Sequence, residues 1–170
     1  SDTELERRCC LAFAIQCLSH GIVFFHAGQD LLRSKCGEDN SYNLPDSINV
    51  FPYDRCNRFP LGYRFFRDLL KCRKELHFLR LTDYAAIRQH EHLISAEAAR
   101  LHIQISDDSR LWHLFINART ESWQPQFQPD EYELIIHDVQ LLHKKAVETL
   151  EIPPLSLTLL RLKDSSHQAL

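Results

Sequence analysis

Residues 21–49 read GIVFFHAGQDLLRSKCGEDNSYNLPDSIN, and the break inside this stretch decides the fold. A short apolar run at 22–25 stops at His26, and a long polar run follows it. A fully apolar run of β-branched and aromatic residues is typical of a buried strand in a parallel sheet. The guanidinium, amide, phenol and carboxylate groups behind it can hydrogen-bond a neutral, hydroxyl-rich ligand. The stretch therefore predicts a buried strand leading into a ligand-binding loop, and the alternative is a plain surface connection.

Helices are predicted on both sides of this strand. Residues 5–19 are apolar nearly all round from Cys9 onward, as in a helix buried on most faces. Residues 59–77 carry Phe65, Leu69 and Cys72 at helical spacing. A helix, a buried strand and a second helix in this order indicate an αβα portion of an α/β fold.

The hydrophobic period changes near residue 80. Four later segments read as strands: 101–105, 111–116, 133–137 and 155–162. No Gly follows Gly62, so the turns between these strands must rely on Asp, Ser, Asn and Pro. We expect an α/β portion at 1–82, an all-β domain at 83–165 and a short tail at 166–170.

Bulk composition excludes several classes of function. The 170-residue chain has a formal net charge of -3 and a pI near 6.3, so neither nucleic acid nor an acidic membrane surface is an expected partner. No apolar run reaches the roughly 18 residues that span a bilayer, and the charged N-terminus lacks the layout of a signal peptide. The chain contains no Met, even at position 1, which predicts a piece of a longer protein. Its six cysteines form no CxxC pair, so we expect free thiols in a reducing cytoplasm.

Carboxylates and histidines outside the 26–49 loop give weak candidates. Asp107 and Asp108 lie in a predicted turn and are expected to face solvent. His90 and His92 would point to one face of a strand, as in a metal site, but no third ligand is in register. We therefore expect two surface histidines, with no metal and no cofactor.

Serine–histidine neighbours and the two tryptophans are further candidates. Ser19-His20 and Ser166-His167 are adjacent in sequence, but the members of a catalytic triad meet through the fold. Trp112 lies in an apolar strand and is expected in the core. Trp123 lies in a Pro- and Gln-rich loop, where packing and a partner contact are equally good interpretations.

The 21–49 stretch closely resembles type I pullulanases, at the segment that runs from their eighth barrel strand into the following loop. The family pattern is a Gly-Ile-Pro-Phe strand, His-Ala-Gly-Gln-Glu/Asp, Arg-Thr/Ser-Lys, Asn-Ser-Tyr and Pro-Asp-x-Ile-Asn. The matching residues here are Gly21, Ile22, Phe24, His26, Ala27, Gly28, Gln29, Asp30, Arg33, Ser34, Lys35, Asn40, Ser41, Tyr42, Pro45, Asp46, Ile48 and Asn49. The departures are Val23 for Pro, Leu44 for Ala, and Pro52-Tyr53 for Asp-Trp.

This resemblance implies an architecture and an activity. Pullulanases are debranching glycoside hydrolases of the α-amylase clan that cleave α-1,6 links in pullulan and branched dextrins. Residues 1–82 would be the closing αβα portion of a (β/α)8 barrel, and 83–165 an antiparallel β-sandwich. Barrel active sites form at the C-terminal ends of the strands, which places the loop at the substrate. The family's catalytic carboxylates come from earlier barrel strands, so no catalytic residue transfers to this chain.

The resemblance also implies roles for individual loop residues. Substrate-binding residues would be Arg33, Asn40, Tyr42, Asp46 and Asn49, whereas His26, Gln29 and Asp30 would support the loop. Arg33 and Asp46 could instead pair with each other and brace the loop. The expected partners are an α-glucan, such as pullulan, branched dextrin or a glycogen-like polymer, and the upstream barrel of the same enzyme.

Three functions remain open at this point. The chain is expected to be the C-terminal part of a cytoplasmic pullulanase-type hydrolase, inactive when isolated because it lacks the catalytic carboxylates. The alternative is a non-catalytic glucan-binding or interaction module derived from such an enzyme. A third interpretation is an unrelated soluble protein whose loop matches by chance.

Overall fold

The fold is taken from a computed structural model that describes residues 1–107, 110–127, 132–145 and 149–162. Its helical elements lie in the first half of the chain, and its strands lie in the second. In order they are α1 (Asp2–Cys17), η1 (Gln29–Leu31), α2 (Asp46–Asn49), α3 (Arg55–Arg58), α4 (Pro60–Glu75), η2 (His77–Arg80), α5 (Tyr84–His90), β1 (Glu91–Glu97), β2 (Arg100–Ser106), β3 (Leu111–Asn117), β4 (Tyr132–Asp138), β5 (Gln140–Lys145) and β6 (Ser156–Leu162).

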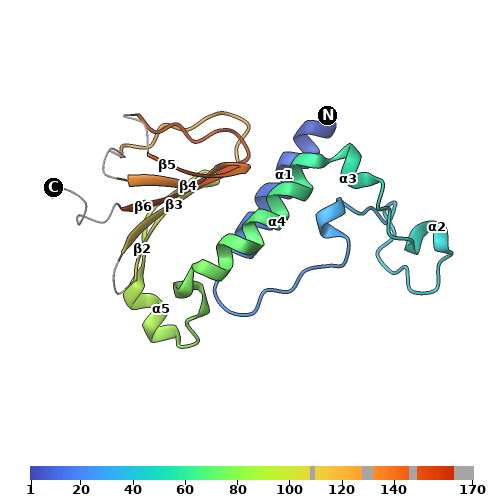
Figure 1. The fold of residues 1–170 in the computed structure, drawn as a ribbon, viewed down its shortest axis with the longest axis horizontal. Coiled ribbons are helices and arrows are strands. Elements are labelled where there is room, and N and C mark those ends of the chain that lie inside the picture. Colours follow the sequence, from blue (N-terminus) through green and yellow to red (C-terminus); the bar gives the residue numbers. More distant parts are fainter. Residues whose placement is uncertain (108–109, 128–131, 146–148, 163–170) are drawn as a thin grey trace, which may run out of the picture.

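The two long helices form where the sequence predicts them. Helix α1 begins at the cap Ser1, whose hydroxyl accepts a hydrogen bond from the Glu4 N–H at 3.3 Å. Helix α4 begins with Pro60, which suits a first helical position. Its predicted stripe of Phe65, Leu69 and Cys72 is buried. The helices therefore pack through their apolar faces, and Figure 1 shows them side by side.

The second half of the chain forms one six-stranded antiparallel sheet in the order β1-β2-β3-β6-β4-β5. All four predicted strands are present as β2, β3, β4 and β6. The edge strands β1 and β5 were not predicted, because EHLISAE and QLLHKK lack a clear alternation of apolar and polar residues.

Apolar side chains cover both faces of the sheet. On one face Trp112, Leu114 and Leu157 join a core with α1 and α4. On the other face Phe115 and Leu160 pack under two connecting segments, which pair through a bridge between Trp123 and Ile152. The predicted antiparallel pairing of the strands is confirmed. The predicted sandwich of two sheets is not what the described residues form, since loops rather than a second sheet cover the outer face.

Residues 22–25 correct a second expectation. They were predicted to be a buried strand, but they pair with no strand in the described chain. The side chain of Ile22 is 100% exposed and that of Phe24 is 85% exposed. A strand is held by hydrogen bonds to a neighbour, and here this extended segment has only the helices beside it. Figure 1 shows the segment running along the side of α1 and α4 away from the sheet.

The turns of the sheet also differ from expectation. Ala98 and Ala99 join β1 to β2 with positive φ angles of 41° and 66°. Asn and Gly normally occupy such positions. The β4–β5 turn does use an expected residue, Asp138, at φ 61°. Its carboxylate pairs with Arg7, whose Nη2 atom also donates to the Pro154 carbonyl at 2.6 Å. This contact ties α1 to the sheet.

Candidate functional site

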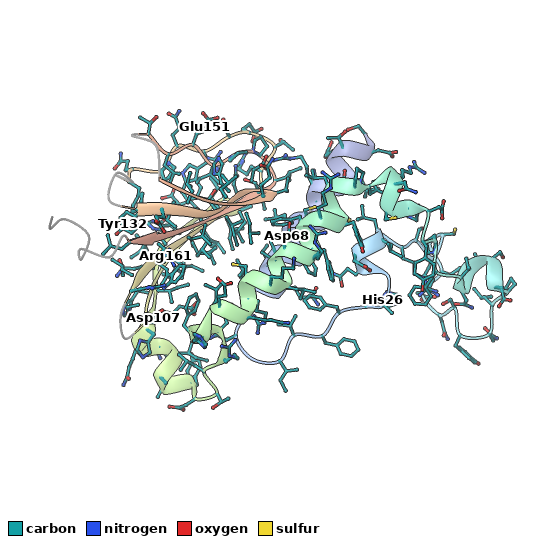
Figure 2. All side chains as sticks on the ribbon, viewed as in Figure 1. His26, Asp68, Asp107, Tyr132, Glu151 and Arg161 are labelled. Carbon is teal, nitrogen blue, oxygen red and sulfur yellow. The ribbon has the colours of Figure 1, made fainter. Side chains whose placement is uncertain are left out.

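The 26–49 loop lies on the helix side that faces away from the sheet. Figure 2 shows His26 at the start of this loop, beyond α1 and α4 as seen from the strands. Exposed polar residues dominate the loop. Leu31 is buried, whereas most residues of the 34–47 part of the loop are exposed.

The first turn of the loop is fixed to α1. The Gln29 amide oxygen accepts from the His26 N–H at 3.3 Å, and the Gln29 Nε2 atom donates to Gln16 Oε1 at 2.9 Å. Gln16 in turn donates to the Phe24 carbonyl. Gly28 adopts φ 89°, a conformation that favours glycine. His26 is exposed and Asp30 is half-buried beside Gln29 in η1. Gln29 thus anchors the end of the extended segment and the start of the loop to α1.

Arg33 is turned into the loop. Its guanidinium donates to the carbonyls of Ala27 and Asn49 and lies 4.3 Å from the centroid of the Phe51 ring. A Cβ on Gly28 would stand 2.8 Å from Arg33 Cδ, so only glycine allows this approach. The Arg33 Nε atom is buried without a partner in the described chain. The expected alternative of an Arg33–Asp46 ion pair does not occur among the described residues, because both Nη atoms are directed to carbonyls.

Asn49 joins the two ends of the loop. Its Nδ2 atom donates to the carbonyls of Ser41 and Leu44 at 2.7 and 2.8 Å. Its Oδ1 atom accepts from Lys35 Nζ at 2.6 Å and from the Ser41 hydroxyl at 3.1 Å. Partial burial, and then the charge of Arg33, lower the pKa of Lys35. Asn49 therefore has its amide fully engaged within the loop.

Three of the predicted binding residues are free to contact a ligand. Asn40 and Asp46 are exposed, and Tyr42 is 83% exposed. Asp46 begins the short helix α2, while Asn40 and Tyr42 lie in the irregular segment before it. The structure thus separates the five predicted binding residues into these three and the internally bonded Arg33 and Asn49.

The other candidates take structural places. Trp112 is buried, and its indole N–H donates to Asp107 Oδ2 at 3.1 Å, so the predicted core position is confirmed. Asp108 lies outside the described residues, as do the Ser166-His167 pair and the rest of the 166–170 tail. His90 ends α5, and His92 lies exposed on β1, so the two do not share a strand.

The described residues hold neither a cluster of metal ligands nor a membrane-spanning helix. Within the described ranges no three His, Cys, Asp or Glu side chains are grouped as metal ligands. No helix in this part of the chain has the length and apolar character needed to cross a bilayer.

A buried histidine pair was missed by sequence reasoning. His102 Nε2 lies 2.8 Å from His113 Nδ1, and His113 Nε2 lies 3.2 Å from the Tyr132 hydroxyl. Burial lowers the pKa of both histidines to about 4. The signal was available, because each histidine interrupts an apolar strand and the predicted 101–116 hairpin brings the two strands together.

Comparisons with known proteins point in one direction. No family model matches the chain. The pullulanase of Bacillus subtilis (strain 168) is 37% identical over 102 residues, which cover 56% of this chain and 14% of that protein. A solved pullulanase type I from the same organism, complexed with maltose, has a TM-score of 0.86 at 25% identity and covers 96% of this chain and 24% of the other.

A second solved structure agrees. The pullulanase from Paenibacillus barengoltzii, in complex with maltohexaose and alpha-cyclodextrin, has a TM-score of 0.85 at 27% identity and covers 96% of this chain and 26% of the other. The chain spans only 14% of the curated relative and about a quarter of these solved chains. By both sequence and fold, the chain is therefore similar to one part of a pullulanase.

Proposed function

We propose that this chain forms the barrel-closing and C-terminal part of a pullulanase-type glycoside hydrolase, which cleaves α-1,6-glucosidic links in pullulan and branched dextrins. In this proposal residues 1–82 close a (β/α)8 barrel, and residues 83–165 form its C-terminal β domain. The 26–49 loop then lines the glucan cleft, as barrel loops after a strand do.

One observation carries the proposal: the exposure pattern of the extended segment at 22–25. Phe25 packs on the helices, with ring centroids 4.9 Å from Phe13 and 5.4 Å from Phe66. Ile22 and Phe24 are directed away from the helices into solvent. Alternate side chains of a barrel strand face the outer helices and the packed barrel interior. Two large apolar side chains exposed at alternate positions support the assignment of this segment to a barrel strand whose sheet neighbours lie outside this chain.

The experiment places one substitution in two contexts. In the isolated chain Phe24→Asp should leave the melting temperature unchanged, because the ring is exposed. In the longest reading frame that contains this chain, the same change should destabilise the enzyme by about 3 kcal/mol or more, as burying an unpaired charge does. The control is Leu93→Asp, at an exposed apolar residue of β1. It should change the melting temperature equally in the isolated chain and in the longer protein. An unchanged melting temperature for Phe24→Asp in the longer protein would remove the barrel assignment.

The chemistry of the loop surface fits a glucan. A pyranose ring presents C–H patches to an aromatic face and hydroxyls to planar polar groups. We assign Tyr42, Asp46 and Asn40 to these contacts, and we assign Arg33 and Asn49 to holding the loop in shape. The maltose and maltohexaose complexes of the related pullulanases support an α-glucan as the ligand.

Hydrolysis itself needs groups that this chain is not expected to supply. Retaining glycosidases use a nucleophilic carboxylate and an acid/base carboxylate across the scissile bond. In the proposal both come from the remaining barrel strands, which are the chain's expected partner. The isolated chain should therefore release no reducing sugar from pullulan above a heat-killed control.

A non-catalytic glucan-binding module is the second candidate, and the internal bonding of the loop favours it. Asn49, Lys35 and Ser41 hold the loop without help from a barrel, so its surface could bind glucan in the isolated chain. Saturable binding of maltohexaose that Tyr42→Ala abolishes, without any longer reading frame, would select this candidate.

A cytoplasmic location is also proposed. All six cysteines are free thiols, and burial raises the pKa of Cys10 and Cys72 to about 12, which keeps them protonated and unreactive. Cell fractionation of the native host would test the location.

A further inference from the structure

A hollow of about 480 Å³ opens beside strands β1 and β2. It lies on the face of the sheet that is turned away from α1 and α4. Strands β1 and β2 form one wall, and residues 123–126 form the other. Because His102 lies opposite Phe115 in the β2–β3 register, this face belongs to the core under the connecting segments and not to the helix side. The sheet and both long helices thus stand between this hollow and the 26–49 loop (Figure 1).

The lining combines the aromatic side chain of Trp123 with four neutral polar side chains, those of Ser95, His102, Gln124 and Gln126. The indole of Trp123 is half-buried and rests against Phe115, with ring centroids 5.7 Å apart. Gln124 and Gln126 line the hollow beside it and are exposed. Amides next to an aromatic ring are the groups that bind sugar hydroxyls and C–H faces.

The charges around the hollow balance each other. Glu97 and Arg100 both line it and flank the β1–β2 turn as a register pair. Arg100 donates to the Ser122 carbonyl at 3.0 Å and to Asn117 Oδ1 at 3.4 Å, and it lies 5.9 Å from the Trp123 ring centroid. One carboxylate and one largely engaged guanidinium favour a neutral ligand over an anion or a cation.

His102 also lines the hollow. Only 8% of this residue is exposed, and its Nε2 atom is engaged with His113. Its Nδ1 atom has no hydrogen-bond partner in the described chain. Both histidines are neutral at pH 7, since burial lowers their pKa values to about 4. The proton between the two rings can lie on either side, so Nδ1 of His102 can donate or accept, as a sugar hydroxyl can.

We propose that this hollow is a second glucan site, which binds a short run of an α-linked neutral oligosaccharide between Trp123, Gln124, Gln126 and His102. The choice of an α-glucan over another neutral sugar rests on the proposed function. The hollow would hold a polymer at a distance from the catalytic cleft and would itself perform no chemistry.

The chain contains its own control for the test, because it has two tryptophans. The Trp123 indole lines the hollow, whereas the Trp112 indole is buried on the opposite sheet face and bonded to Asp107. Titration of the 15N-labelled chain with maltohexaose should shift the Trp123 indole N–H resonance and leave that of Trp112 in place. Cellohexaose tests the linkage and should shift neither.

Variants locate the binding. The double variant Gln124→Ala/Gln126→Ala alters only exposed side chains and should weaken maltohexaose binding about tenfold with an unchanged melting temperature. Gln140→Ala, at an exposed glutamine on the far edge of the sheet, should leave binding as it is. All measurements use a Tyr42→Ala/Asp46→Ala background, so that the 26–49 loop contributes no glucan binding. A failure of the proposed role of the loop is then distinguishable from a failure of the proposed second site. An unmoved Trp123 resonance, or unchanged binding in the double variant, would overturn the proposal.

Discussion

The carboxylate of Glu6 on α1 accepts a hydrogen bond from the backbone N–H of Gly62 on α4, at 2.7 Å. Both residues are buried, so this bond ties the two long helices together away from water. A Cβ on Gly62 would stand 3.0 Å from Leu32 Cδ1 and 3.5 Å from the Glu6 carboxylate, so glycine keeps the helices and the loop in close contact.

Removing this acceptor should weaken the helix pair. Glu6→Ala leaves the Gly62 N–H buried without a partner, which costs about 1–3 kcal/mol. Glu6→Gln keeps an acceptor and should cost less. Glu4→Ala on the same helix removes only an exposed ion pair with Arg8 and serves as the control. Urea denaturation measures all three, and equal midpoints for Glu6→Ala and Glu4→Ala would refute the role of the bond.

The β1–β2 turn should tolerate glycine better than alanine. Ala99 has φ 66°, a conformation that costs an L-residue about 1 kcal/mol relative to glycine. We expect Ala99→Gly to raise the melting temperature, whereas Ala96→Gly, within β1, should lower it. Thermal unfolding followed by circular dichroism compares the two, and a loss of stability in Ala99→Gly would contradict the turn geometry.

Stability should fall on mild acidification because of the buried histidines. The pKa of both His102 and His113 is lowered to about 4 in the fold, against 6.5 as the usual value. Between these values the unfolded chain binds more protons than the folded chain, so stability decreases as pH falls from about 6.5 to about 4.

Substitution separates the pair from other groups. His113→Phe removes one of the two titrations and should flatten this slope. His92→Asn, at an exposed histidine, should leave the slope unchanged. The measurement is the free energy of unfolding at several pH values, and the same slope in wild type and His113→Phe would rule out the pair as its source.

Substitution of two asparagines in the loop should have different effects on protease cleavage of the loop. Asn49→Ala removes an amide that makes four hydrogen bonds within the loop, so residues 35–48 should become far more sensitive to protease. Asn40→Ala changes an exposed side chain with no partner in the described chain and should leave the cleavage rate unchanged. Limited proteolysis with mass spectrometry measures both rates, and similar cleavage in the two variants would count against the role of Asn49.

The sequence predicts those elements whose residues carry their own periodicity. The stripe of Phe65, Leu69 and Cys72 predicts α4, and the alternation at 101–105 predicts β2. The edge strand β1 is not predicted, because most of its side chains are exposed. Its sequence therefore lacks the apolar alternation that marks a buried face. Residues 22–25 have strand composition, yet they form no strand because no neighbour in the described chain pairs with them.

The loop was predictable in kind but not in detail. Its residue types indicate hydrogen bonding, and composition cannot tell whether a given amide faces a ligand or another part of the loop. Arg33 and Asn49 face inward because the carbonyls of Ala27, Ser41 and Leu44 need donors there. The exposed side chains of Asn40, Tyr42 and Asp46 are not directed to such carbonyls.

We propose that this loop surface contacts the glucan in a pullulanase-type enzyme. The most direct test of this contact is kcat/KM for branched dextrin in the longest reading frame that contains this chain. Tyr42→Ala and Asp46→Ala should each lower kcat/KM about tenfold, a loss of about 1.4 kcal/mol in transition-state binding, with unchanged melting temperatures. The control is Tyr84→Ala, at an exposed tyrosine on α5 outside the loop, which should have the kcat/KM of the wild type. Unchanged kinetics in both loop variants would contradict the claim.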